Sequence, residues 1–170
     1  MARSKAADLL EKLTRFVPGI SGYQDREKRR ASDKAVRDSA AGAVLKCREL
    51  VLGMMSELSR SKGLSNLKSV GVLEGTAVKL ERLEDELRYA SYGYSGFFDR
   101  DGISIDELED LYDSDLSLLE SAGKLEGMVG DSPPQSASSG WVKDLGDAVD
   151  ELSGSVSSRK KKLDSERGRV

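Results

Sequence analysis

Two pairs of closely spaced aspartates are the residues of this 170-residue chain that could do acid–base chemistry. They are Asp99 with Asp101, and Asp113 with Asp115. Two carboxylates act as general acid and base when a neighbouring group separates their pKa values, and no such partner is evident here. The chain has no histidine, which removes Ser-His-Asp and Cys-His catalysis and zinc sites that use imidazole. The sequence therefore predicts that the protein is not an enzyme.

The segment from Asp99 to Glu107 resembles a calcium-binding loop in its acidic residues and its glycine. When Gly102 is placed at the invariant sixth position, Phe97 and Leu108 fall at the first and twelfth positions. Neither residue has a side-chain oxygen, although both positions supply essential ligands in such loops. The sequence thus predicts a polar turn that leads into the next helix, with no metal and no other cofactor.

A basic string marks the first part of the longest expected helix. Its members are Arg26, Lys28, Arg29, Arg30 and, two turns later, Arg37. Clustered cations can bind phosphates, which would suit a ribosome- or RNA-associated factor. The same residues also fit a solvated helix, since Asp25 with Arg29 and Asp33 with Arg37 are spaced for i,i+4 ion pairs. Residues 1–62 carry a net charge of +6 and residues 63–122 one of −9, so pairing within the chain is the favoured prediction.

Six of the nine aromatic residues lie between Tyr89 and Tyr112. Glycines 93 and 96 separate these rings and predict a sharp corner between two helices. The rings fill the end of a bundle or bind a partner, and the candidate contacts are Tyr92, Tyr94, Phe97 and Phe98. We expect the phenylalanines to point inward and at least one tyrosine to be exposed.

The elements that position these residues follow from helical periodicity. A short first helix, rich in leucine, ends at Pro18-Gly19, and its opposite face is basic. It either packs on the bundle or lies on an anionic membrane surface, and packing is favoured. A long helix spans about 23–60, with a dense apolar face in its second half and a mostly solvated first half. A third helix begins between Ser65 and Thr76 and runs to about Tyr92.

The sequence Ser104-Ile-Asp-Glu107 is a capping box that opens a fourth helix. The expected buried stripe of that helix contains Ile105, Leu108, Leu111, Tyr112, Leu116 and Leu119. Residues 123–140 are rich in Gly, Ser and Pro and are predicted to form a linker. Residues 141–170 are predicted to form an amphipathic helix with a frayed basic end at Arg159–Lys162. The predicted division is thus a bundle core over 1–122, the linker, and a C-terminal helix.

Composition agrees with this pattern. The chain has 34% charged residues, 38% apolar residues and three prolines, which is typical of a soluble helical protein. Its single cysteine, Cys47, falls on an apolar helix face and is predicted to be a buried, inert thiol. One cysteine permits no intramolecular disulfide, and no apolar run is long enough to cross a bilayer, so the cytoplasm is the expected location. We predict an all-α, up-and-down bundle of four to five helices.

Three motifs carry a resemblance to a known family. They are the run from Val17 to Lys34 (VPGISGYQDREKRRASDK), the run from Tyr92 to Asp99 (YGYSGFFD) and the run from Leu111 to Leu116 (LYDSDL). Together they resemble a small prokaryotic family of helical bundles that has no assigned activity. The resemblance implies a compact bundle and implies no catalytic residue.

The function expected from these observations is that of a non-enzymatic interaction or scaffold module. Its partner contact is expected at the aromatic corner, and the identity of the protein partner is open. One alternative is an RNA-associated factor that uses the basic string. A second is a peripheral membrane protein that binds through its first helix.

Overall fold

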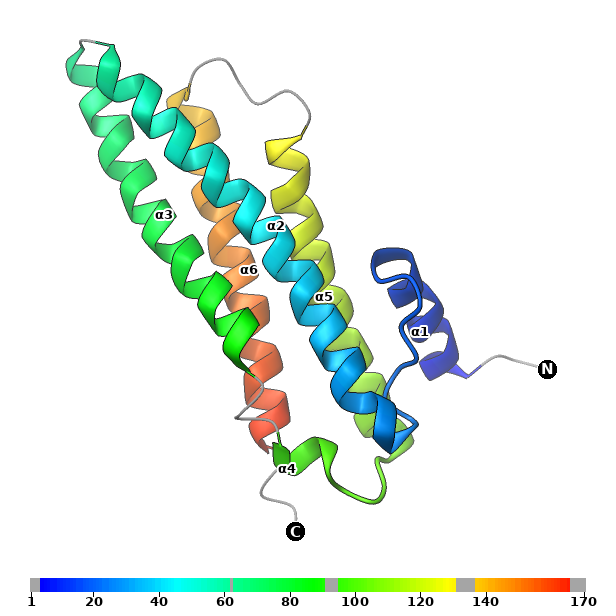
Figure 1. The fold of residues 1–170 in the computed structure, drawn as a ribbon. Coiled ribbons are helices and arrows are strands. Elements are labelled where there is room, and N and C mark those ends of the chain that lie inside the picture. The colour runs from blue at the N-terminus through cyan, green and yellow to red at the C-terminus, as the bar shows by residue number, and fades with distance from the viewer. Residues whose placement is uncertain (1–3, 62, 91–94, 131–136, 166–170) are drawn as a thin grey trace.

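The computed structural model describes residues 4–61, 63–90, 95–130 and 137–165. Across these ranges the chain forms six helices and no strand, which confirms the predicted all-α bundle. The helices are α1 Lys5–Phe16, α2 Arg26–Arg60, α3 Leu64–Tyr89, α4 Ser95–Phe98, α5 Ile105–Val129 and α6 Ser139–Ser165 (Figure 1). None of the helices in these ranges combines the length and the apolar character that crossing a bilayer requires.

The long predicted helix is α2, and it begins three residues later than expected. Asp25 caps its first turn, where the carboxylate accepts a hydrogen bond from the Glu27 amide at 3.1 Å. Tyr23 therefore belongs to the preceding loop. The capping box that opens α5 is confirmed, because Ser104 Oγ accepts from the Glu107 amide and Glu107 accepts from the Ser104 amide.

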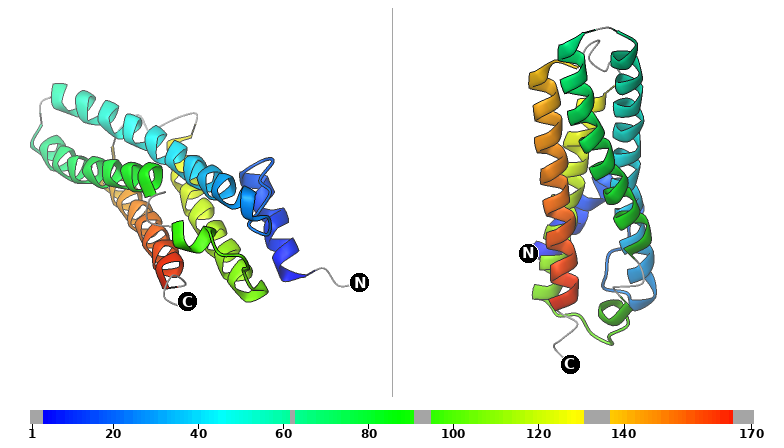
Figure 2. Two further views of the ribbon diagram at one scale, coloured as in Figure 1. Left: turned by 60° about the horizontal axis from the view of Figure 1, so that its bottom comes forward. Right: turned by 90° about the vertical axis from the view of Figure 1, so that its left-hand side faces the viewer.

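Four long helices form the bundle, and their order in space differs from their order in the chain. α2 packs against α3 and α5, and α6 packs against the same two helices, so α3 and α5 occupy opposite corners (Figures 1 and 2). Consecutive long helices run in alternating directions, as predicted. The connection from α3 to α5 must therefore cross the end of the bundle, and it carries the short helix α4, which contacts α2.

One continuous core runs through all of these helices and includes α6. Val142, Leu145, Val149, Leu152 and Val156 of α6 are buried in it. The predicted linker is wrong for residues 123–129, which continue α5, while residues 131–136 lie outside the described part. Ala122 and Leu125 extend the buried face of α5 past Gly123, so tertiary packing outweighs the low helix propensity of glycine.

Ile105 is the one member of the predicted buried stripe of α5 that lies on the surface. Its side chain is 67% exposed, whereas Leu108, Leu111, Tyr112, Leu116 and Leu119 are buried. The reason is its position at the first residue of α5, one turn before the core begins at Leu108.

The helix α1 packs on α5, in agreement with the favoured prediction. Its apolar face is buried through Ala6, Leu9 and Leu13, and Lys5 pairs with Glu109 and Asp113 of α5, each at 3.4 Å. The leucines of this face are therefore committed to the bundle.

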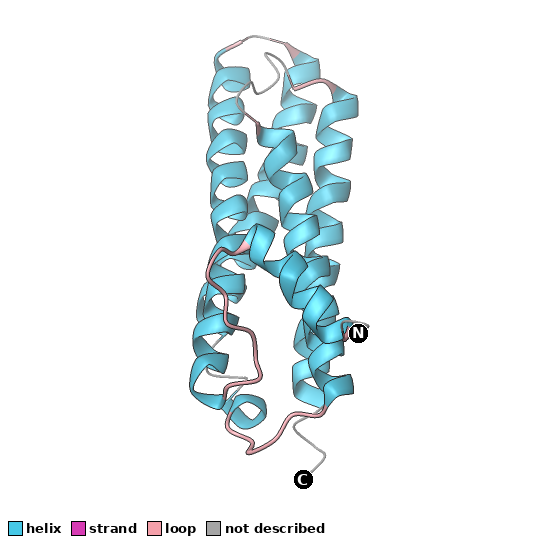
Figure 3. Ribbon diagram, turned by 90° about the vertical axis from the view of Figure 1, so that its right-hand side faces the viewer, coloured by secondary structure: helices cyan, strands magenta, loops and turns pink. Residues whose placement is uncertain are grey.

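Two loops meet at the α4 end of the bundle, namely residues 17–25 and residues 99–104 (Figure 3). In the first loop Gly19 and Gly22 have φ angles of +81° and +75°, a region that side chains with a Cβ rarely adopt. A Cβ on Gly22 would lie 2.4 Å from the Tyr112 hydroxyl, whereas one on Gly19 would meet no atom within 4 Å. Gly22 is thus required both by its backbone conformation and by its contact with α5.

This difference gives a matched pair of substitutions. Gly19→Ala should lower the free energy of unfolding by about 1 to 2 kcal/mol, because only the backbone is strained. Gly22→Ala should lower it by at least about 1 kcal/mol more, because Tyr112 must also move and lose its hydrogen bond to the Tyr23 amide. Urea unfolding of both variants measures the difference, and equal losses would contradict the close contact at Gly22.

Candidate functional site

The buried face of α2 continues into charged residues. Val36 and Ala40 of α2 are buried. Three charged residues on the same side of the helix, Arg29, Asp33 and Arg37, are buried too. The prediction of a mostly solvated first half is wrong for this face, since Arg29 is only 2% exposed. Charged groups remain inside a protein when partners replace the lost water.

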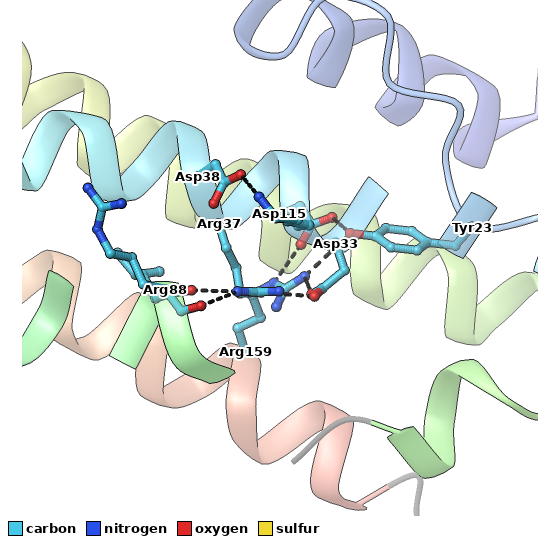
Figure 4. A network of polar contacts seen from close by, with 9 residues as sticks. Tyr23, Asp33, Arg37, Asp38, Arg88, Asp115 and Arg159 are labelled. Atoms are coloured by element: carbon cyan, nitrogen blue, oxygen red, sulfur yellow. Dashed lines mark hydrogen bonds and ion pairs between the residues drawn. The ribbon is translucent and has the colours of Figure 1, made fainter. Parts of the chain in front are cut away.

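These partners form an ionic network that includes Tyr23, Asp33, Arg37, Asp115 and Arg159 (Figure 4). Arg159 Nη2 donates to Asp33 Oδ1 at 2.8 Å, and Arg159 Nε donates to Asp115 Oδ1 at 2.7 Å. Arg37 Nε donates to the other oxygen of Asp33 at 2.9 Å. Tyr23 Oη donates to the other oxygen of Asp115 at 2.6 Å. Both oxygens of each carboxylate therefore accept at least one hydrogen bond.

The ionic network joins all four long helices. Asp33 and Arg37 come from α2, Asp115 from α5 and Arg159 from α6. Arg37 Nη1 reaches α3 by donating to the Leu87 carbonyl at 2.6 Å, close to the end of that helix. Carbonyls in the last turn of a helix lack an intrahelical partner, so this contact also caps α3.

The network has no net charge, because two arginines face two aspartates and all four are almost fully buried. Such a set contributes little to stability compared with apolar residues of equal size. Removal of one member is costly, because it leaves an uncompensated charge in the interior. The arrangement therefore disfavours any alignment of the helices in which one of these charges loses its partner.

Arg159 was expected in a frayed basic tail, and that prediction is wrong. On α6, Arg159 lies three residues after Val156 and four residues before Leu163, and both of these residues are buried. Leu152, four residues before Val156, is buried as well. Periodicity places Arg159 at a core position, and this was the signal that the sequence offered. The apolar stem of arginine packs in the core while the guanidinium meets Asp33 and Asp115.

Tyr23 connects the ionic network to the aromatic corner. Its ring lies 5.8 Å from that of Phe98 and 5.6 Å from that of Tyr112, and its amide donates to the Tyr112 hydroxyl at 3.1 Å. Phe97 packs edge-on against Phe98, with ring centroids 5.4 Å apart. Both phenylalanines are buried, as expected, so they fill the end of the bundle. Tyr92 and Tyr94 lie outside the described residues.

A second buried arginine ties the two loops together. Arg29 Nε donates to the Tyr23 carbonyl, and Arg29 Nη1 donates to the Arg100 carbonyl, both at 2.7 Å. Burial, with the nearby cations Arg26 and Arg100, lowers the pKa of Arg29 from its ordinary value. Arg29 thus holds the loop before α2 and the loop before α5 together through their backbone carbonyls.

Burial and charge fix the protons of the network. Burial raises the pKa of Tyr23 well above its ordinary value, and the neighbouring Asp115 raises it further. Burial also raises the pKa of Asp115, although Arg159 and the Tyr23 hydroxyl oppose that shift. For Arg159 burial opposes the charge, but Asp115, Tyr23 and Asp33 together raise its pKa above the ordinary value. These shifts favour a protonated Tyr23 hydroxyl that donates to Asp115 and a charged Arg159 that pairs with Asp33 and Asp115.

The predicted phosphate-binding set is divided by the fold. Arg29 and Arg37 are buried and bonded to backbone carbonyls, so they do not reach the surface. Arg26 pairs with Asp101 at 2.6 Å, Arg30 with Asp99 at 2.8 Å, and Lys28 with Asp25 at 3.6 Å. The expected pairing of residues 1–62 with residues 63–122 is confirmed by the Arg26 and Arg30 contacts, whereas Lys28 pairs within its own segment.

The aspartates and the cysteine that could do chemistry are bonded to other residues of the chain or buried. Asp113 pairs with Lys5 on the surface, and Asp115 belongs to the ionic network. Cys47 is buried, as predicted, and burial raises the pKa of its thiol to about 12. A thiol that stays protonated at neutral pH is a poor nucleophile.

The most exposed leucines lie at the far end of the α2–α3 hairpin. Leu64 is 86% exposed and Leu67 is 66% exposed. They border a hollow of about 490 Å³. We call its lining residues the tip surface: Leu58, Ser59, Ser61, Gly63, Leu64, Asn66 and Leu67. Sequence reasoning missed this surface because Gly71 and Gly75 obscured the start of α3, which lies at Leu64.

A comparison of the chain with protein-family models, curated proteins and solved structures finds no match. What the protein does must therefore be inferred from its own residues and contacts.

Removal of the network's central cation tests its structural role. Arg159→Met keeps an apolar stem but leaves Asp33 and Asp115 without their shared partner. We expect the free energy of unfolding to fall by about 3 to 5 kcal/mol. Lys160→Met is the matched control on the same helix, since Lys160 is exposed and its pair with Glu86 spans 3.7 Å. That variant should change stability by less than about 1 kcal/mol, and equal losses in urea unfolding would contradict a central role for Arg159.

The raised pKa of Tyr23 predicts a loss of stability at alkaline pH. In the unfolded chain tyrosine loses its proton near pH 10, whereas folded Tyr23 retains it. The unfolded state then binds fewer protons, so the contribution of Tyr23 to stability is constant below about pH 10 and falls by about 1.4 kcal/mol per pH unit above it. Cys47 adds to the loss between pH 9.0 and about 12. Urea unfolding across pH should show a smaller slope for Tyr23→Phe than for the wild type, and identical slopes would refute the assignment.

Proposed function

We propose that this protein is a non-enzymatic interaction or scaffold module that contacts its partner through the tip surface. The observation that carries the proposal is the exposure of Leu64 and Leu67 side by side at the end of the α2–α3 hairpin. Isolated exposed apolar residues are normal, but neighbouring ones around a hollow are typical of contact surfaces.

The ionic network at the other end supports this proposal. It gives the bundle a fixed alignment, and a rigid scaffold presents a contact surface with a small entropy cost on binding. The buried Phe97 and Phe98 serve the bundle, so any partner contact at the aromatic corner falls to Tyr92 and Tyr94. Because Asp115 and Tyr23 are buried and bonded to each other, they support a structural role over an acid–base one.

The two alternatives find less support. An RNA would have to displace Asp99 and Asp101 from Arg30 and Arg26, and would gain nothing from the buried Arg29 and Arg37. Membrane binding through α1 would require Leu9 and Leu13 to leave the core. The cytoplasm remains the location that we propose, with the buried thiol Cys47 in reduced form.

The proposal predicts that native complexes depend on the tip leucines. The double variant Leu64→Ser with Leu67→Ser should remain folded, because both side chains are exposed, and should lose the components that co-fractionate with the wild type from a native lysate. The control is Ile105→Ser, since Ile105 is as exposed as Leu67 but lies at the opposite end of the bundle. If the double variant retains the same components as the wild type, the tip surface is not the contact site.

A further inference from the structure

We propose that the tip surface docks on an anionic lipid bilayer. This inference rests on the proposed function, because it names the partner of the same surface. Three features support it: exposed apolar side chains at the end of the α2–α3 hairpin, an excess of basic residues around them, and a helix N-terminus at Gly63 that has no side-chain cap.

The apolar part is too small for a protein interface of ordinary size. A stable interface takes about 800 Å² and 20 to 30 residues from each partner. The tip surface has seven residues, and only Leu58, Leu64 and Leu67 are large and apolar. Shallow insertion into the boundary between headgroups and acyl chains needs only a few such side chains, provided that cations flank them.

Those cations are present. The segment from Glu57 to Leu73 contains three basic residues, Arg60, Lys62 and Lys68, and one acidic residue, in a chain whose net charge is −3. Arg60 and Lys68 are exposed. The tip is therefore locally basic, and each cation near an anionic membrane favours binding.

The start of α3 adds partial positive charge at the same place. Gly63 makes no side-chain capping hydrogen bond, and the first turn of α3 has no acidic residue. The other capped helices place Ser4, Asp25 or Ser104 at this position. Backbone amides at a helix N-terminus attract phosphate oxygens. Leu64 is the first residue of this turn. The backbone amides of the turn can therefore bind a lipid phosphate while the Leu64 side chain contacts the acyl chains.

The long axis of the bundle separates this tip from the acidic residues between α4 and the start of α5. Figures 1 and 2 show the α2–α3 turn at the opposite end from α4 and from the start of α5. Asp99, Asp101 and Asp106 lie at that opposite end. A helix the length of α5 spans on the order of 37 Å, which is several times the Debye length of about 8 Å at physiological salt. Repulsion between these acids and an anionic membrane is thus screened when the tip docks.

The test is sedimentation of the purified full chain with vesicles. One set contains phosphatidylcholine alone, and the other contains phosphatidylcholine and phosphatidylglycerol in equal parts. We expect binding to the second set that weakens with salt. Leu64→Ser with Leu67→Ser should weaken it at least about 30-fold, and Arg60→Gln with Lys68→Gln should also weaken it about 30-fold. The exposed controls Ile105→Ser and Lys160→Gln, both at the opposite end of the bundle from the tip surface, should bind like the wild type.

Insertion can be followed directly with Leu67→Trp in a chain that also carries Trp141→Phe. Its emission should shift to the blue on anionic vesicles, and brominated acyl chains should quench it. Equal binding of the wild type to both vesicle sets, absence of binding, or binding that ignores the tip leucines would overturn the lipid proposal. If the vesicles fail while lysate complexes still require Leu64 and Leu67, the partner is a protein and the interaction module stands. If the lysate complexes also ignore these leucines, both proposals fall.

Discussion

The two salt bridges of Arg159 are the interaction on which the rest of the structure depends. This single side chain from α6 binds Asp33 of α2 and Asp115 of α5. Apolar faces pack in several alignments at similar free energy, whereas a buried charge tolerates only the one in which it meets its partner. We infer that the network selects the register of the helices, while the leucines and valines around it supply most of the stability.

The same end of the molecule resolves a topological problem. Because α3 and α5 occupy opposite corners, the chain has to cross the bundle between them. Phe97 and Phe98 cover the core along this path, and Arg29 holds the backbone at Arg100. The loop before α2 is bound in the same way, through the Tyr23 carbonyl. The loops at one end are thus held by hydrogen bonds to buried side chains. The other end instead exposes Leu64 and Leu67 to potential partners.

Periodicity predicted five of the six described helices but not the short α4. The Ser-x-x-Glu pattern predicted the capping box at Ser104, and the large apolar area of the rings predicted the inward phenylalanines. Periodicity failed where a charged residue occupied a core position, because the charge of Asp33, Arg37 and Arg159 suggested a place in solvent. Their spacing from Val36, Ala40 and Val156 indicated the core, but only the tertiary structure shows that opposite charges converge there. The spatial order of the helices could not be predicted either, since it depends on contacts between segments far apart in the chain. The tip surface was hidden because glycine has a low intrinsic helix propensity, which packing overrides.

The sequence separation within the network has a consequence for biosynthesis. Arg159 lies 126 residues after Asp33 and 136 after Tyr23. During translation the aspartates of α2 and α5 emerge long before their shared cation, so a nascent chain without α6 cannot close its polar core. We expect Asp33 and Asp115 to stay hydrated in such a chain, because no cation replaces the water around them. The arginine near the end of α6 therefore makes synthesis of α6 a condition for a fully packed interior.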